Sequence, residues 1–379
     1  MTTTFESLGL ATPLLRNLTI AGYEVPTPIQ SQAIPYALAG RDVQGIAQTG
    51  TGKTAAFALP ILHRLLADRK QAPARGCRVL VLSPTRELAS QIADSFVTYA
   101  RGTGVRVAVM FGGVPKGRQA RAVAGGIDVL VACPGRLLDH IGDGAVRLDA
   151  VEVLVLDEAD HMLDLGFIIP IRRIVSMIPT KRQTLFFSAT MPPEISQLAA
   201  AMLRDPAHVA VTPVATTAEK VEQRVIHVDA TRKRQVLAEL LRDPDMTRTL
   251  VFTRTKHGAD RVVEYLERAG YKAAAIHGNK SQGQRERALA AFKAGQVRVL
   301  VATDIAARGI DVDQVTHVVN FELPNVPESY VHRIGRTARA GHAGVAISLC
   351  DQSERQFLRG IEKLIRSRLP VEPVTRLAA

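Results

Sequence analysis

The stretch DVQGIAQTGTGKTAAFALPILHRLL, residues 42–66, joins a short apolar run to a glycine-rich turn and then to a segment compatible with a helix. Gly50 and Gly52 allow backbone N–H groups to curl around phosphates. The Lys53 ammonium can reach the β and γ oxygens, and the Thr54 hydroxyl can bind magnesium. The general phosphate-loop pattern begins with glycine, whereas this one begins with alanine. A turn that only caps a structural helix therefore remains an alternative at this point.

Short apolar, β-branched runs recur along the chain, each followed by a turn and a helical pattern. This alternation is typical of a parallel sheet with crossover helices. The predicted strands are residues 42–46, 78–82, 105–110, 129–132, 151–156 and 184–187 in the first half, and 223–228, 249–252, 272–276, 297–301, 317–320 and 345–349 in the second.

The length of 379 residues exceeds the usual size of one hydrophobic core, so we expect two α/β domains. A segment rich in Pro, Thr and Ala, without helical periodicity, separates the two groups of strands. We place the domains at residues 1–208 and 220–379, and the linker at 209–219.

Composition narrows the possible partners and the compartment. An excess of 48 Lys+Arg over 36 Asp+Glu gives a net charge of +12, which favours a polyanionic partner without naming it. Aromatic residues make up 4% and Trp is absent, which argues against base stacking as the main contact. Three scattered cysteines provide neither a disulfide framework nor a CxxC metal site. With no secretory signal and no apolar run of membrane-spanning length, we expect a cytoplasmic protein without a membrane partner.

Acidic residues follow the predicted strand at 151–156. Asp157 is placed to join a metal shell, through a water molecule, and Glu158 to orient or deprotonate an attacking water. A solvated acidic turn is the alternative, but the same half of the chain also carries the phosphate loop. Together the two elements predict a nucleoside triphosphatase that uses magnesium, and they leave its wider function open.

Arginines gather in HRIGRTAR, residues 332–339, of the second half. Arg333, Arg336 and Arg339 have helical spacing. An arginine that reaches the γ-phosphate from a second domain stabilises the transition state and makes hydrolysis depend on domain closure. A solvated basic face on a helix is an equally good explanation of this motif alone.

Ten motifs in order resemble those of the DEAD-box RNA helicases. They are GYEVPTPIQ (22–30), AQTGTGKT (47–54), PTRELA (84–89), GG (112–113), CPGR (133–136), DEAD (157–160), SAT (188–190), VFTRT (251–255), ATDIAARGID (302–311) and HRIGRTAR (332–339). Residues 277–293 look most like the bacterial RhlE-type members. The resemblance implies two tandem RecA-like domains, each a mainly parallel sheet flanked by helices.

The resemblance also implies an ATP site. Gln30 would read the adenine edge, since an amide offers one donor and one acceptor, with Tyr23 beside the ring and Phe5 as an upstream aromatic. Ser188, Thr190 and His332 would couple hydrolysis to strand separation, and Arg336 and Arg339 would contact the γ-phosphate. The other implied ATP contacts are Thr49, Gly50, Thr51, Gly52, Lys53, Thr54, Gly309 and Asp311.

The implied RNA contacts share chemistry suited to phosphates and 2′-hydroxyls, which reads RNA shape rather than sequence. They are Pro84, Thr85, Arg86, Gly113, Pro134, Gly135, Arg136, Arg254, Gly278, Gln282, Arg285 and Thr303. Two positions depart from the family pattern. Cys133 replaces a threonine, so we expect a weaker RNA contact there with RNA binding kept. Ala338 replaces a glycine beside the arginine pair, where we expect hydrolysis to survive.

We therefore expect an ATP-dependent RNA helicase that closes on ATP and RNA together, unwinds short duplexes locally and remodels RNA–protein particles. Its partners would be single-stranded and short duplex RNA, with ribosome-assembly or RNA-degradation proteins as further candidates. An ATP-gated RNA clamp with little unwinding is an alternative, because it needs the same closed state. A DNA translocase shares the phosphate loop and the acid pair, but the GYEVPTPIQ and DEAD motifs argue against it.

Overall fold

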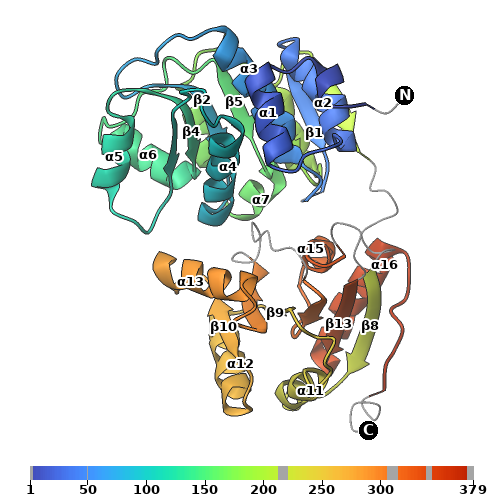
Figure 1. Ribbon diagram of the computed structural model, residues 1–379. Helices are drawn as coiled ribbons and strands as arrows, with labels where there is room; N and C mark the ends of the chain where they lie inside the picture. The colour runs from blue at the N-terminus through green and yellow to red at the C-terminus, as the bar shows by residue number, and fades with distance from the viewer. Residues whose placement is uncertain (1–2, 49, 212–220, 305–314, 339–343, 374–379) are drawn as a thin grey trace. The chain divides into compact units, whose positions relative to one another are not determined.

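The computed structural model describes residues 3–48, 50–211, 221–304, 315–338 and 344–373. The chain divides into two compact units, Met1–Thr212 and Pro213–Ala379. Each unit is a parallel sheet flanked by helices (Figure 1). The predicted α/β class with tandem RecA-like domains is confirmed.

The first unit contains a seven-stranded sheet in the order β3-β4-β2-β5-β6-β1-β7, in which every neighbouring pair is parallel. Its strands are β1 (Val43–Ile46), β2 (Cys77–Leu82), β3 (Val107–Met110), β4 (Ile127–Ala132), β5 (Val153–Leu156), β6 (Gln183–Ser188) and β7 (Ala207–Ala210). Its helices are η1 (Glu6–Leu8), α1 (Thr12–Ile20), α2 (Pro28–Leu38), α3 (Lys53–Ala67), α4 (Arg86–Tyr99), α5 (Lys116–Val123), α6 (Pro134–Gly142), α7 (Ala159–Asp164), α8 (Ile168–Val175) and α9 (Pro193–Met202).

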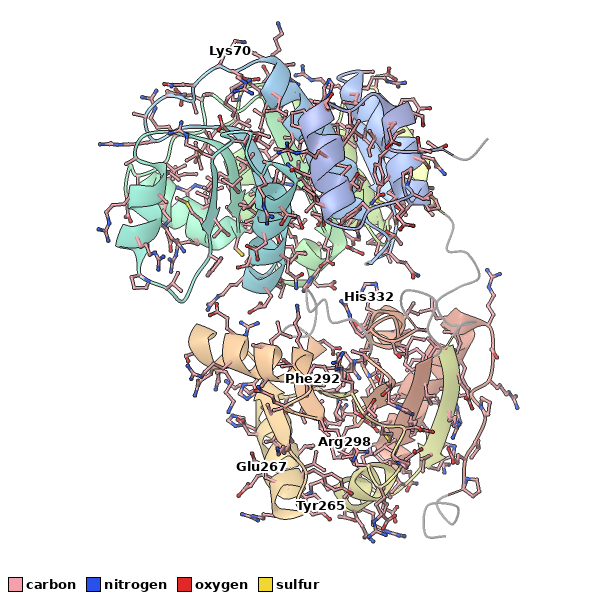
Figure 2. All side chains as sticks on the ribbon, in the orientation of Figure 1. Lys70, Tyr265, Glu267, Phe292, Arg298 and His332 are labelled. Atoms are coloured by element: carbon pink, nitrogen blue, oxygen red, sulfur yellow. The ribbon has the colours of Figure 1, made fainter. Side chains whose placement is uncertain are left out.

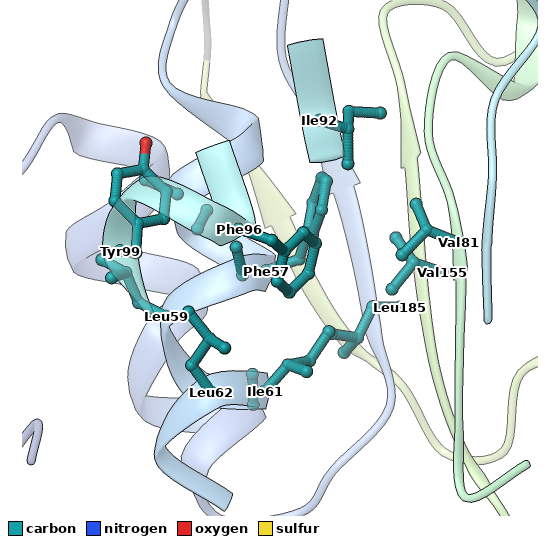
Figure 3. Packing of buried hydrophobic residues seen from close by; sticks show 14 of the residues in the cluster. Phe57, Leu59, Ile61, Leu62, Val81, Ile92, Phe96, Tyr99, Val155 and Leu185 are labelled. Carbon is teal, nitrogen blue, oxygen red and sulfur yellow. The ribbon is translucent and has the colours of Figure 1, made fainter. Parts of the chain in front are cut away.

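Helices cover both faces of this sheet. Because successive side chains of a strand point to opposite sides, each strand contributes to two apolar clusters. Val79 and Val81 of β2 join one apolar cluster with residues of α1 to α4. Leu80 and Leu82 join a second cluster with residues of α5 to α9. In the first cluster Phe57 of α3 packs beside Phe96 of α4 over the strands (Figure 3). This packing fixes the helix that follows the phosphate loop.

The second unit contains a six-stranded parallel sheet in the order β10-β11-β9-β12-β13-β8. Its strands are β8 (Val221–His227), β9 (Thr249–Thr253), β10 (Ala273–Ile276), β11 (Val299–Thr303), β12 (His317–Asn320) and β13 (Gly344–Cys350). Its described helices are α11 (Lys233–Leu240), α12 (Lys256–Arg268), α13 (Gln282–Lys293), α15 (Pro327–Ile334), η2 (Gln352–Glu354) and α16 (Arg355–Ile365). Two apolar clusters cover its two faces in the same way.

All twelve predicted strands are present, with ends that differ by a few residues. One further strand, β7, was not predicted, and its last two residues, 209 and 210, fall within the predicted linker. It pairs with β1 at the sheet edge, and only Ala207 and Val209 of its residues are buried. A four-residue edge strand contributes too few apolar residues to stand out in a sequence. Among the described residues, no helix combines the length and apolarity needed to cross a membrane.

Candidate functional site

The phosphate loop lies between β1 and α3. Gly50 and Gly52 have left-handed backbone φ angles of 80° and 89°, and Gly52 is the N-cap of α3. Because α3 begins directly after this turn, the N–H groups of its first turn are positioned to bind an anion at the loop. The buried Lys53 ammonium donates to the Ala47 carbonyl at 2.9 Å. The Thr51 hydroxyl donates to another carbonyl of the loop at 2.7 Å.

Gln30 braces this loop from α2. Its Oε1 accepts from the Thr27 backbone N–H at 2.9 Å, and its Nε2 donates to the Gly52 carbonyl at 3.1 Å. A Cβ added to Gly52 would lie 2.3 Å from Gln30 Nε2, so the close approach requires glycine. The GYEVPTPIQ motif and the phosphate loop are thus one packed unit.

Two aromatic residues predicted for the ATP site pack against each other. The Phe5 ring packs edge-on against Tyr23, with centroids 6.3 Å apart. The Tyr23 hydroxyl lies 2.7 Å from that of Tyr99, at the end of α4. Phe5 is buried, whereas Tyr23 is exposed at the surface.

The acidic motif follows β5 directly. Asp157 is 2% exposed, and its Oδ1 makes no hydrogen bond within the described residues. Burial raises the pKa of Asp157 to about 6, and the positive charge of Lys53 acts in the opposite direction. Glu158 has a left-handed φ of 56°, a conformation that is strained for a side chain with a Cβ. Its Oε2 lies 3.2 Å from His161 Nδ1.

Asp160 joins the acidic motif to the SAT motif that follows β6. Its Oδ2 accepts from the Thr190 backbone N–H at 2.9 Å and from the Thr190 hydroxyl at 2.8 Å. Ser188 Oγ accepts from the Asp160 N–H at 3.2 Å and donates to the Thr190 carbonyl at 2.8 Å. A displacement of either motif therefore breaks several buried or partly buried hydrogen bonds at once.

The predicted RNA contacts of the first unit follow β2, β3 and β4. These strands are neighbours in the sheet, so their carboxyl ends lie along one edge. The Arg86 guanidinium packs directly over Gly113: a Cβ added there would lie 1.9 Å from Arg86 Nη1. Thr85 caps α4 by accepting from the Leu88 N–H at 3.3 Å. Pro134 is buried, and Gly135 is exposed at the start of α6.

Arg136 is largely enclosed by protein. Its Nη1 donates to the Val114 carbonyl at 2.9 Å and to Gln119 Oε1 at 3.2 Å. Its Nε lies 3.7 Å from Asp139. Cys133, the N-cap of α6, is also buried, and burial raises the pKa of its thiol to about 12. The thiol is therefore a neutral packing group.

In the second unit, Arg333 is a structural residue. It is 1% exposed, and its Nε and Nη2 bind the two oxygens of Asp304 at 2.5 and 2.7 Å. Its Nη1 donates to Asn320 at 3.1 Å and to the Glu322 carbonyl at 2.6 Å. The sequence left open whether Arg333 belongs to a solvated basic face or to the arginines that reach the γ-phosphate. The partner that explains its burial lies 29 residues away.

The arginine motif does not remain helical, which corrects the expected spacing. Helix α15 ends at Ile334, followed by Gly335, and Arg336 lies in the next turn with 5% of its surface exposed. Ala338 has a left-handed φ of 55°, which explains why glycine suits this position. His332 is half-buried on α15 (Figure 2).

Further predicted RNA contacts follow β9, β10 and β11, which are neighbours in the second sheet. Arg254 Nη2 lies 3.4 Å from the buried carboxylate of Glu354, and its Nη1 donates to Asn325 at 3.3 Å. Gly278 is exposed after β10, and Thr303 ends β11. Arg285, on α13, is 8% exposed. The predicted residues Thr49, Gly309, Asp311 and Arg339, and the side chain of Gln282, lie outside the described residues.

Parallel sheets with a phosphate loop and an acidic strand end define a P-loop nucleoside triphosphatase. Residues 27–198 match the family model of the DEAD/DEAH box helicases, and residues 232–341 match the helicase conserved C-terminal domain. The ATP-dependent RNA helicase CshA of Limosilactobacillus reuteri is 44% identical over 98% of this chain and 74% of that protein. The DEAD-box ATP-dependent RNA helicase CshA of Bacillus subtilis is 42% identical over 97% and 74%.

Saccharomyces cerevisiae Dbp5 bound to RNA and ADP BeF3 aligns with a TM-score of 0.87 and 30% identity, over 98% of this chain and 96% of that one. The chain belongs to the DEAD-box ATP-dependent RNA helicases, which are RNA-dependent ATPases. The relatives named here are CshA proteins rather than the RhlE-type members expected from residues 277–293.

We predict that Gly113→Ala weakens RNA binding by at least about tenfold, because the new Cβ would displace the Arg86 guanidinium. Gly104→Ala is a matched control, since Gly104 has a φ of 83° and open space around it. Both variants carry the same backbone strain. Fluorescence anisotropy with labelled single-stranded RNA checks this, and equal affinities for the two variants would contradict it.

We also predict that Ala338→Gly raises the free energy of unfolding by about 0.5 kcal/mol. Glycine removes the strain of the left-handed backbone at Ala338, about 1–2 kcal/mol. This gain exceeds the two losses, which are the greater conformational entropy of the unfolded chain and the missing methyl contact. Ala290→Gly, at an exposed position inside α13, should instead lose about 1 kcal/mol. Calorimetry of the full chain checks the two signs, and destabilisation by both variants would overturn the assignment of strain.

Proposed function

We propose that the edge of the first sheet beyond β1, β5 and β6 binds ATP with Mg2+ and hydrolyses it. The observation that carries this proposal is the buried Asp157 carboxylate, whose Oδ1 has no hydrogen bond among the described residues. A buried acid normally has partners. Asp157, through a water molecule, and the Thr54 hydroxyl would hold a divalent cation, which would add positive charge beside this carboxylate to that of Lys53.

Each neighbouring residue then has a role that its position supports. Lys53 and the N-terminus of α3 bind the phosphates. Glu158, fixed after β5 with His161 beside it, orients the attacking water. Gln30 selects adenine while it braces the phosphate loop, with Tyr23 beside the ring. Magnesium held there would stabilise the charge that develops on the phosphates during hydrolysis.

In the same proposal, residues of the second unit also contact the nucleotide. Arg336 and Arg339 stabilise the transition state at the γ-phosphate, and Gly309 and Asp311 contact the nucleotide. Asp160, Ser188 and Thr190 transmit the state of the nucleotide site, because their hydrogen bonds join the loops after β5 and β6. His332 contributes to this coupling.

RNA binds along the loops after β2, β3 and β4 in the first unit and after β9, β10 and β11 in the second. Hydrolysis then drives closing and opening of the two units and separates short duplexes locally. We place the protein among CshA-like helicases, which is supported by identities of 42–44% to CshA proteins. A cytoplasmic location belongs to this proposal as an expectation from the sequence. The proposal also includes ribosome-assembly or RNA-degradation proteins as partners, because an RNA helicase acts on the RNA that such proteins bind.

The direct test compares Glu158→Gln with Glu194→Gln. Both remove one negative charge, but Glu194 is exposed on α9. We predict that Glu158→Gln binds ATP and single-stranded RNA with affinities near those of the parent, while RNA-stimulated hydrolysis falls by about 10²–10⁴-fold. Glu194→Gln should hydrolyse normally.

Phosphate release, measured with single-stranded RNA, with DNA and without nucleic acid, checks these rates. A hydrolysis rate in Glu158→Gln within a few-fold of the parent would sink the assignment of Glu158. Failure to displace a strand from a short duplex, despite normal stimulation by RNA, would favour the ATP-gated clamp.

A further inference from the structure

Gln119 is a buried polar residue that the proposed function leaves without a role. It lies on α5 and is 8% exposed. Its Nε2 donates to the Phe111 carbonyl at 3.1 Å. Its Oε1 accepts from Arg136 Nη1 at 3.2 Å and lies 3.1 Å from His140 Nε2. The amide thus uses one donor and both lone pairs of its oxygen.

These partners come from two loops that leave the same edge of the sheet. Phe111 precedes the glycine pair after β3, whereas Arg136 and His140 lie on α6, which follows β4. Arg136 Nη1 also donates to the Val114 carbonyl, just beyond the glycine pair. The segment around Gly113 is therefore held on both sides, by Gln119 at Phe111 and by Arg136 at Val114.

The third loop joins the same assembly. Arg86, which follows β2, packs its guanidinium directly over Gly113. Side-chain contacts therefore join the loops after β2, β3 and β4. Gln119 joins the loops after β3 and β4 through its hydrogen bonds to Phe111 and Arg136. Because Gln119 is buried beneath these loops, it acts on a bound strand only through them.

His140 can serve as a neutral donor in this cluster. It is 1% exposed, and burial together with the charges of Arg136 and Lys116 lowers its pKa. Asp139 and Asp143 act in the opposite direction. A neutral ring with its proton on Nε2 satisfies Gln119 Oε1 without adding a second buried cation beside Arg136.

We propose that Gln119 is a positioning residue for RNA, whose amide sets the distance between the Gly113 loop and the start of α6. This inference rests on the proposed function, which places RNA along these loops. A phosphate contact requires donors within a few tenths of an ångström of the right distance. Loss of the amide lets the two loops separate. Arg86 and the N-terminus of α6 are then no longer at the right distance from each other to contact the same RNA backbone.

The chain offers a closely matched control in Gln183. It is 6% exposed, and its Nε2 donates to the carbonyls of Ala37 at 2.9 Å and Arg41 at 2.7 Å. Arg64 Nη1 donates to its Oε1 at 3.5 Å. Gln183 is the first residue of β6, so it lies at the amino ends of the strands, whereas the RNA loops follow the carboxyl ends. It shares the residue type, burial and number of hydrogen bonds with Gln119.

The experiment compares Gln119→Leu with Gln183→Leu in the full chain. ATP hydrolysis is measured as a function of single-stranded RNA concentration, and melting temperature is measured in parallel. We expect both substitutions to lower the melting temperature to a similar extent, because each leaves buried polar groups unpaired. Gln119→Leu should raise the half-saturating RNA concentration about tenfold, with a much smaller change in the rate at saturating RNA. Gln183→Leu should leave the half-saturating concentration unchanged.

Gln119→Glu provides a second reading if Gln119→Leu fails to fold. It keeps two acceptors for Arg136 and His140 but loses the donor to Phe111, so it should also raise the half-saturating RNA concentration. If a folded Gln119 variant matches Gln183→Leu in its RNA dependence, Gln119 is only structural and the inference is wrong. If neither the parent nor Gln183→Leu responds to RNA, the proposed function fails instead.

Discussion

The parallel direction of every strand is the constraint on which this structure depends. Parallel strands end at the same edge, so the loops that follow them are neighbours in space although they are distant in sequence. The order β3-β4-β2-β5-β6-β1-β7 then divides this row of carboxyl ends into two halves. The loops after β1, β5 and β6 carry the phosphate loop, the acids and SAT, whereas those after β2, β3 and β4 carry the proposed RNA contacts. In our proposal, the loops of the first half bind the nucleotide and those of the adjoining half bind RNA.

Buried polar groups hold these loops in place. Gln30 fixes the phosphate loop at Gly52, and Asp160 fixes the SAT motif through Thr190. In the second unit Arg333 is neutralised by Asp304 in a bidentate pair. An unpaired buried charge or amide is costly, so such contacts break together rather than one at a time. This makes the loops suited to switching between discrete states, which an ATP-dependent helicase requires.

The sequence predicted strands and motifs well because both are local signals. Apolar runs mark buried strands, and the spacing of glycines and lysine marks the phosphate loop. It failed where the deciding contact is distant. The burial of Arg333 depends on Asp304, and the role of Gln119 depends on Phe111 and Arg136. In a sequence, Gln119 is only a polar residue of an amphipathic helix. Strand β7 was missed because four edge residues carry little apolar signal.

The division of the sheet edge is tested most directly by hydrogen–deuterium exchange of the full chain. ADP–beryllium fluoride alone should slow exchange in the loops after β1 and β5. Addition of single-stranded RNA should then slow exchange at residues 84–86, 112–114 and 134–136, which follow β2, β3 and β4. Protection by RNA that avoids these three segments, or that falls at the opposite edge of the sheet, would contradict the account.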